Sequence, residues 1–141
     1  MKRTASAQWR GDLKSGKGTM STSSGVLSNS PYSFRTRFED EKGTNPEELL
    51  AAAHAGCFSM ALSAQLAQAN LTAESIETTC SISLEKQPDG FAITESHLEL
   101  RARVPGASQE AFDRAVQNAK SGCPVSKLFK ANITLTSKLE S

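Results

Sequence analysis

Three cysteines are the residues of this 141-residue chain best suited to covalent chemistry: Cys57, Cys80 and Cys123. Their number is odd, and no two of them have the Cys-x-x-Cys spacing. The chain starts with polar residues rather than an apolar leader, so we expect no secretory signal and a cytoplasmic location. In such a reducing compartment structural disulfides are rare, and a cysteine is more often buried or reactive.

Cys123 has the clearest signal for reactivity. It precedes Pro124, and proline is favoured at the first position of a helix, so we predict that Cys123 is the N-cap of a short helix. A sulfur there faces free N–H groups and the positive end of the dipole, which lowers its pKa from about 8.5. Cys57 would gain the same stabilisation only if its own helix broke near Gly56, and a neighbouring arginine would lower its pKa further.

A thiolate of this kind attacks the O–O bond of a peroxide and becomes a sulfenic acid, which a second thiol captures as a disulfide. This reaction would need only two cysteines, one arginine and one carboxylate that holds the arginine. Two other interpretations stay open. The cysteines could be buried and inert, or His54, Cys57 and Cys123 could bind a metal ion, although no second histidine lies near them in sequence. The motifs of serine hydrolases and nucleotide-binding proteins are absent.

The longest apolar segment must position Cys57. Asn45 is suited to the N-cap of a helix, Pro46 to its first position and Glu48 to the third, where it closes a capping box. Glu47, one position earlier, is left free for other work. The apolar pattern continues to about Ala69, although glycine at position 56 costs about 1 kcal/mol against alanine in a helix.

The other segments alternate in polarity, as strands do. Tyr32–Glu39 is predicted as a strand that projects Arg35 and Arg37 from one face, where exposure to water is their default role. Cys80 lies on the apolar face of a strand over Ser75–Leu84 and is interpreted as a core residue. The remaining predicted strands are Ala5–Trp9, Gly18–Ser23, Phe91–Val104 with a bulge near Thr94–His97, and a closing strand through Ile133, Leu135 and Leu139.

A helix from Ser108 to Gly122 completes the predicted elements, which together form an α+β fold. The length of the chain suggests one domain over residues 1–141. Its hydrophobic content of 38% and charged content of 22% are those of an ordinary soluble protein. A net charge of +1 gives no field to attract nucleic acid or an anionic membrane. No apolar run approaches the roughly 18 residues of a membrane helix.

Several motifs resemble the OsmC/Ohr family of bacteria, and in particular its branch of osmotically inducible proteins C. The resemblance covers nearly the whole chain, and the two cysteine motifs are the most specific part of it. The matching segments are residues 16–19 (GKGT), 24–27 (SGVL), 36–38 (TRF), 41–49 (EKGTNPEEL), 53–62 (AHAGCFSMAL), 90–94 (GFAIT) and 119–126 (AKSGCPVS).

The resemblance implies a cysteine-based peroxidase that reduces organic hydroperoxides, and hydrogen peroxide less well. Cys57 would be the peroxidatic cysteine and Cys123 the resolving one. Arg37 would polarise thiolate and peroxide, and Glu47 would orient Arg37. The family fold implied is a set of antiparallel sheets wrapped around central hydrophobic helices in an intertwined homodimer. No haem, flavin or metal is expected, and dihydrolipoyl groups could be the external dithiol reductant.

One geometric problem follows. On a straight helix Glu47 and Cys57 would be about 15 Å apart, too far for one cluster. We therefore predict a bend near Gly56, with Arg37 supplied by the partner subunit. A stress protein whose cysteines sense oxidation without turnover, or play only a structural role, is the alternative function.

Overall fold

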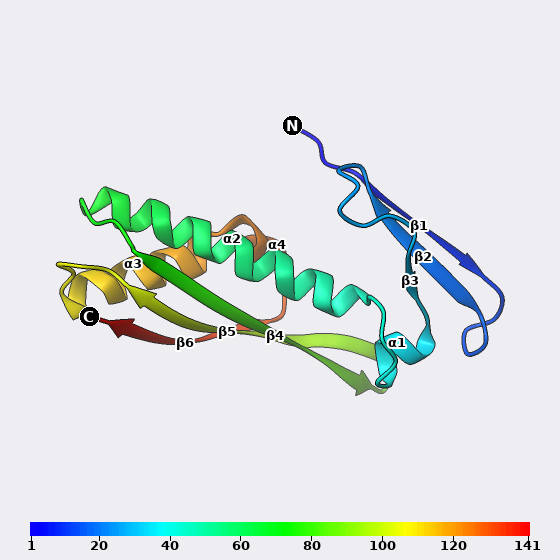
Figure 1. Ribbon diagram of the computed structural model, residues 1–141. Coiled ribbons are helices and arrows are strands. Elements are labelled where there is room, and N and C mark those ends of the chain that lie inside the picture. Colours follow the sequence, from blue (N-terminus) through cyan, green and yellow to red (C-terminus); the bar gives the residue numbers. More distant parts are fainter. The chain divides into compact units, whose positions relative to one another are not determined.

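Residues 1–49 contain a small antiparallel sheet of order β1-β2-β3 (Figure 1). Its strands are β1 (Ala5–Arg10), β2 (Lys17–Thr22) and β3 (Ser30–Tyr32), so both predicted strands of the amino-terminal region are confirmed to within a few residues. The hairpin is close-packed at Gly18, where an added Cβ would lie 2.7 Å from the ring of Trp9 and 2.5 Å from that of Tyr32. The computed structural model describes all residues from Met1 to Ser141.

The predicted strand over Tyr32–Glu39 is wrong. The strand ends at Tyr32, and Phe34–Phe38 form a short helix, α1. Ser33 and Thr36 make a capping box: the Ser33 hydroxyl accepts from the Thr36 N–H at 3.2 Å, and the Thr36 hydroxyl accepts from the Ser33 N–H at 2.8 Å. These local hydrogen bonds outweigh the alternating pattern, which predicted the wrong period.

Helix α2 runs unbroken over Pro46–Gln68. It begins as predicted, because the Asn45 side chain accepts a hydrogen bond from the Glu48 N–H at 2.8 Å. The predicted bend near Gly56 is wrong. A Cβ at Gly56 would have no atom within 4 Å, so nothing packs there to interrupt the helix. The buried stripe of His54, Phe58, Leu62 and Leu66, spaced four residues apart, holds the helix on both sides of the glycine.

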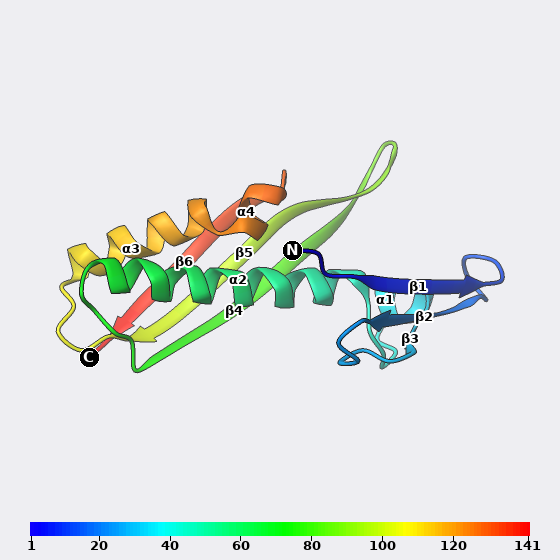
Figure 2. The same ribbon diagram turned by 90° about the horizontal axis from the view of Figure 1, so that it is seen from above.

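Residues 50–141 contain the second sheet, of order β4-β5-β6 (Figure 2). Strands β4 (Ser75–Gln87) and β5 (Gly90–Arg103) are antiparallel, with the predicted bulge at Thr94, where the pairing moves from Ser83–Glu95 to Leu84–Ile93. The expectation of purely antiparallel sheets is wrong, because β6 (Asn132–Glu140) is parallel to β5. A parallel neighbour needs a long crossover, which α3 (Gln109–Gly122) and α4 (Pro124–Leu128) provide.

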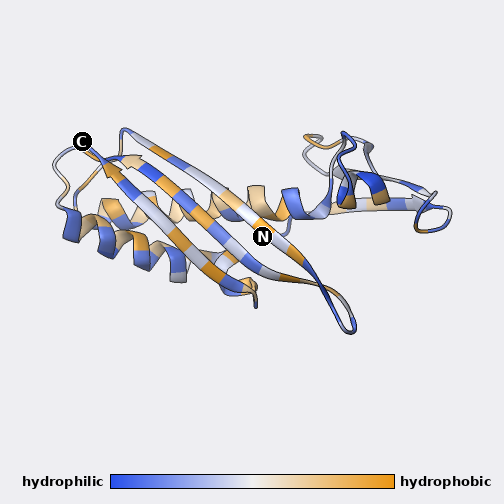
Figure 3. Cartoon of the chain, turned by 90° about the horizontal axis from the view of Figure 1, so that it is seen from below, coloured by the Kyte–Doolittle hydropathy of each residue, from blue (hydrophilic) through white to orange (hydrophobic).

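The helices of this second unit cover one face of its sheet (Figure 2). Hydrophobic and hydrophilic residues alternate along its strands (Figure 3), and in β5 the buried residues Leu98, Leu100 and Ala102 alternate with polar ones, so the other face of the sheet is polar. Arg101 pairs across that polar face with Glu140 at 2.9 Å. Cys80 is partly buried against the core, as predicted. The fully or almost fully buried apolar residues are Phe58, Leu62, Leu66, Leu98, Leu100, Ala102, Val104, Phe112, Ala115, Val116, Ala119 and Cys123.

Helix α2 is also long and apolar enough to cross a membrane, judged by length and composition alone. The expectation that no apolar run approaches this length is therefore wrong. Core helices of soluble proteins pass the same test, but here only 22% of the apolar window is buried within the chain. Met60, for example, is 78% exposed. The chain thus leaves an apolar face of α2 uncovered.

Candidate active site

Cys57 and Cys123 lie side by side, with their sulfur atoms 2.8 Å apart and hydrogen-bonded. This separation is less than 1 Å longer than a disulfide bond of about 2.05 Å, so a small movement would join them. Both are free thiols. Cys57, within α2, is partly exposed, whereas Cys123, between α3 and α4, is fully buried. A small molecule from solvent can reach only the first of the two sulfurs.

The surroundings of the two thiols push their pKa values in opposite directions. Burial raises the pKa of Cys57, and its hydrogen bond with Cys123 raises it further. Burial also opposes ionisation of Cys123, but hydrogen bonds with Cys57 and with the backbone and hydroxyl of Ser126 outweigh it, so the pKa of Cys123 is lowered. The hydrogen bond that the two sulfurs share, in which the Cys123 thiol donates, contributes to both directions.

The opposite directions of the two pKa shifts agree with the places of the two cysteines in their helices. Cys123 is the N-cap of α4, as predicted, with Pro124 after it. Cys57 sits in the interior of the unbroken α2, so its own helix offers it no N-terminus, although the Val125 N–H of α4 favours its ionisation. The lowered pKa that a helix break would have given Cys57 is therefore absent. A positive group is needed if Cys57 is to hold the negative charge.

Arg37 and Glu47 form a second pair, within residues 1–49. The Nε of Arg37 donates to Glu47 Oε1 at 2.6 Å, and the carboxylate side chain is only 13% exposed. Because Nε is the atom engaged, the two terminal amino groups of the guanidinium can face another anion. Glu47 Oε2 is buried and has no hydrogen-bond partner. The carboxylate is therefore prepared to accept one more donor.

The unbroken helix α2 separates the Arg37–Glu47 pair from the Cys57–Cys123 pair. Glu47 lies in the first turn of α2 and Cys57 ten residues later, a rise of about 15 Å along the axis. The structure thus brings Arg37 to Glu47 and Cys57 to Cys123, but α2 holds Glu47 and Cys57 of one chain apart.

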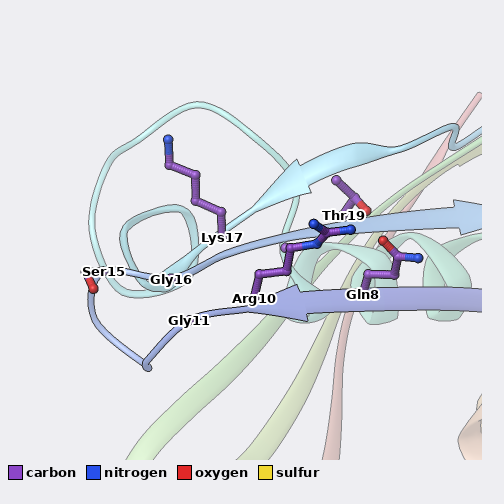
Figure 4. A pocket seen from close by; sticks show the side chains of 8 residues that line it. Gln8, Arg10, Gly11, Ser15, Gly16, Lys17 and Thr19 are labelled. Carbon is purple, nitrogen blue, oxygen red and sulfur yellow. The ribbon is translucent and has the colours of Figure 1, made fainter.

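Three hollows lie in the first unit, and Arg37 lines two of them. One of 280 Å³ has aromatic walls and includes Arg37; its lining is Trp9, Leu13, Tyr32, Ser33, Phe34, Arg37 and Phe38. The second hollow beside Arg37 has a volume of 550 Å³ and mostly polar walls from Thr36 to Glu48. The third, on the β1–β2 hairpin, has a volume of 430 Å³ and side chains such as Gln8, Arg10 and Lys17 around it (Figure 4). None of the sequence-predicted site residues lines this hairpin hollow.

His54 has hydrogen-bond partners that the sequence did not reveal. It is fully buried, and its two ring nitrogens are hydrogen-bonded to the hydroxyls of Ser96 and Ser126. With both nitrogens engaged, the ring is not open to a metal ion, and no cluster of three His, Cys, Asp or Glu side chains suits one. The only available signal was its position three residues before Cys57 in the apolar stripe.

Comparisons with known proteins agree on one family. Residues 39–138 match the family model described as OsmC-like protein. The chain is 58% identical over 135 residues to peroxiredoxin OsmC of Escherichia coli strain K12, covering 96% of this chain and 94% of that protein. It is 35% identical over 102 residues to an organic hydroperoxide resistance protein-like 1 of Staphylococcus epidermidis, covering 72% of each.

The fold agrees as well. The crystal structure of the organic hydroperoxide resistance protein OhrB of Bacillus subtilis is similar with a TM-score of 0.68 and 26% identity, over 97% of this chain and 98% of that one. The match in sequence, together with the mixed α+β architecture, shows that this chain belongs to the OsmC family.

Proposed function

We propose that this chain is a cysteine-based peroxidase that reduces organic hydroperoxides, and hydrogen peroxide less efficiently, in defence against oxidative and osmotic stress. The observation that carries the proposal is the pair of free thiols 2.8 Å apart, of which only Cys57 is accessible. Relatives named peroxiredoxin and organic hydroperoxide resistance protein support the same activity.

The reaction requires a thiolate on Cys57. Cys123 can keep the proton of the pair, since its thiol donates to the Cys57 sulfur at 2.8 Å, and the negative charge then lies on the accessible sulfur. Cys57 then attacks the terminal oxygen of the hydroperoxide, the O–O bond breaks, and the alkoxide takes up a proton to leave as the alcohol. Cys57 is now a sulfenic acid.

Cys123 completes the cycle as the resolving thiol. Its sulfur loses its proton and attacks the sulfur of Cys57, the S–O bond breaks, and the hydroxide leaves as water once protonated. An external dithiol then reduces the disulfide, supplying two electrons and two protons and becoming a disulfide itself. We propose a small dithiol or a dihydrolipoyl group for this role, and the mechanism uses no haem, flavin or metal.

Arg37 is proposed to place the charge on Cys57. Its guanidinium, oriented by Glu47 through Nε, would hold the thiolate and the peroxide oxygen with the two terminal amino groups. Because the continuous α2 separates Glu47 from Cys57 of the same chain, we propose that the partner subunit supplies the Arg37–Glu47 pair. The aromatic hollow beside Arg37 would hold the organic group of the substrate.

A homodimer is the assembly that this mechanism requires. Two features of the single chain support it. The exposed apolar face of α2 carries small residues (Ala52, Ala53, Gly56) next to Met60, which allow a second copy to approach closely. The first unit has no buried apolar side chain of its own. We propose that residues 1–141 act as one domain in an intertwined cytoplasmic dimer, without nucleic-acid or membrane partners.

Consumption of cumene hydroperoxide with dithiothreitol as reductant tests the proposal. Cys57→Ser should abolish the activity, because no other thiol is placed to attack. Cys123→Ser should allow one oxidation of Cys57 and then stall or over-oxidise. Cys80→Ser is the matched control and should keep turning over. A Cys57→Ser variant at the wild-type rate refutes the mechanism, and a wild-type chain that oxidises once without turnover points to a redox sensor.

A further inference from the structure

The short helix α4 follows Cys123 directly, so its position decides where the second sulfur lies. It has five residues, and a helix of this length is not stable by itself, because nucleation is unfavourable. Contacts with the rest of the chain must therefore hold it. Leu128 at its end is 75% exposed, and Ser126 is the only buried residue of the helix. The buried anchor of α4 is thus a hydroxyl, which needs a polar partner.

His54 on α2 is that partner. Its Nε2 lies 2.8 Å from the Ser126 hydroxyl, and its ring meets the edge of Phe129, the C-cap of α4, with the centroids 5.1 Å apart. On the other side of the ring, Nδ1 lies 2.5 Å from the hydroxyl of Ser96 on β5. His54 and Ser96 are both fully buried. The ring therefore bridges α4 and the sheet from its place on α2.

These contacts need no charge on the ring. Burial lowers the pKa of His54, which keeps the imidazole neutral. A neutral imidazole donates from one nitrogen and accepts at the other, and a serine hydroxyl can do either. Both hydrogen bonds therefore form in either tautomer. The proposed mechanism does not use His54, so the purpose of a fully buried polar residue at this place is still open.

The position of the contact next to the thiol pair suggests its purpose. His54 precedes Cys57 by three residues on α2, and Ser126 follows Cys123 by three residues. Residues three apart lie one helical turn from each other on the same face. The His54–Ser126 contact thus lies one turn from the Cys57–Cys123 contact, and both join α2 to the same short segment. A movement of α4 that breaks the first contact also separates the two sulfurs.

We propose that His54 is a positioning residue for the resolving step: its hydrogen bond to Ser126 fixes α4 against α2 and keeps the Cys123 sulfur within reach of Cys57. The sulfurs are 2.8 Å apart and need less than 1 Å of movement to bond, so the reaction gains when α4 stays in place. His54 acts through the position of α4 and not on the reacting atoms. The name resolving step rests on the proposed function, but the positioning can be measured without peroxide.

The first measurement is the equilibrium of the thiol pair with glutathione. Two protein thiols and oxidised glutathione give the Cys57–Cys123 disulfide and two reduced glutathiones. After a denaturing quench with an alkylating reagent, the reduced chain carries three labels and the disulfide form one. Ser126→Ala should lower the equilibrium constant about fivefold, the contribution of one neutral hydrogen bond. The reduction potential then becomes less negative by about 20 mV. An unchanged constant overturns the proposal.

Replacements of His54 separate the hydrogen bond from the packing of the ring. The amide of His54→Gln can reach the place of Nε2 and bind Ser126, whereas the shorter His54→Asn replaces Nδ1 only. We expect His54→Gln to keep the constant near the wild-type value and His54→Asn to lower it as Ser126→Ala does. His54→Asn combined with Ser126→Ala should be no worse than either alone, because both break the same contact. Equal effects of the Gln and Asn variants, or additive effects in the double variant, contradict the assignment.

Leu66→Ala is the control for a general loss of stability. Leu66 belongs to the same buried stripe of α2 but lies nine residues beyond Cys57. Its truncation leaves a cavity in the core and destabilises the fold. The glutathione constant of this variant should nevertheless stay near the wild-type value, because α4 keeps its anchor. A loss as large as that of Ser126→Ala would assign the effect to the stability of the whole unit and overturn the proposal.

The second measurement uses peroxide and follows the fate of the Cys57 sulfenic acid. It either reacts with Cys123 to form the disulfide or takes a second peroxide and becomes a sulfinic acid, and mass spectrometry distinguishes the two products. In Ser126→Ala, half of the chains should be over-oxidised at about fivefold less cumene hydroperoxide than in the wild type. An unchanged ratio of the products contradicts the proposal. A wild-type chain inert to the peroxide counts against the proposed function instead, while the glutathione results stand apart from it.

Discussion

The two units of this chain differ in how much of their structure they bury. Residues 50–141 hold all twelve buried apolar residues, whereas in residues 1–49 only Gly16, Gly18 and Thr36 are buried. The second unit carries the thiol pair and the first carries the Arg37–Glu47 pair. In the proposed mechanism, the unit with its own core supplies the nucleophile, and the unit without one supplies the positive charge.

This difference suggests why the peroxidase should depend on assembly. A unit of 49 residues without an apolar core has little to offset the entropy of ordering its chain. Its arginine is therefore held firmly only when something covers the unit. If the Cys57 thiolate depends on the arginine of this unit, the thiolate forms only in the assembled protein.

The largest expected effect on stability concerns two aromatic residues, Phe58 in the second unit and Trp9 in the first. Phe58→Ala removes a side chain with no exposed surface and should lower the free energy of unfolding by about 3–5 kcal/mol. Trp9 is 37% exposed in the single chain, so Trp9→Ala should cost about 1 kcal/mol, within the usual range for a point mutation. Urea unfolding measures both. Equal costs would show that a partner buries Trp9 and that the first unit does have a core.

The next effect concerns catalysis. Arg37→Met should lower the peroxidase rate by about 10²–10³, the loss seen when one group that stabilises developing charge is removed. Arg35 is the matched control: it lies on the same helix, is 65% exposed and pairs with Glu39 at 3.1 Å. Arg35→Met should stay within about twofold, because exposed ion pairs contribute little. A similar loss for both variants would mean that the net charge of α1, not the placement of Arg37, governs the rate.

The sequence predicted the second unit better than the first, and the physical reason is burial. Strands β4 and β5, the bulge at Thr94 and the capped helix α3 all follow from periodicity that a buried face enforces. The strand assigned to Tyr32–Glu39 failed because no core selects a period there, and the Ser33–Thr36 capping box decides the local structure. The parallel pairing of β6 could not be predicted, because periodicity carries no information on strand direction.

Residue types and motifs predicted the Cys57–Cys123 and Arg37–Glu47 pairs. The structure changed the expected direction of the pKa of Cys57, which burial raises. Cys123 was placed correctly at a helix N-terminus because Pro124 marks that position. The bend at Gly56 was predicted from the cost of glycine, which the buried stripe from His54 to Leu66 overrides. The serines around His54 could not be found, because Ser96 and Ser126 are 30 residues apart in sequence and meet only through the fold.

The smallest effect is expected at two helix caps. Ser108 caps α3 in the second unit, accepting from the Ala111 N–H at 3.1 Å, and Ser33 caps α1 in the first. Ser108→Ala should lower the free energy of unfolding by about 1 kcal/mol and leave the peroxidase rate unchanged. Ser33→Ala should leave the free energy of unfolding unchanged and lower the peroxidase rate. The lost cap destabilises α1 by a similar free energy, and this five-residue helix is marginal by itself. Arg37 is therefore out of position more often, and the rate should fall about fivefold while unfolding of the core is unaffected.

Urea unfolding and peroxide consumption on the same two variants measure this crossed pattern. The pattern has a direct physical meaning, because a local free energy changes global stability only if the segment belongs to the cooperative unit that unfolds. If Ser33→Ala lowers global stability as much as Ser108→Ala does, the first unit unfolds together with the core, and its covering partner is already in place in solution. If neither variant changes the rate, the orientation of α1 does not limit catalysis, and Arg37 must act at longer range than a hydrogen bond to the Cys57 thiolate.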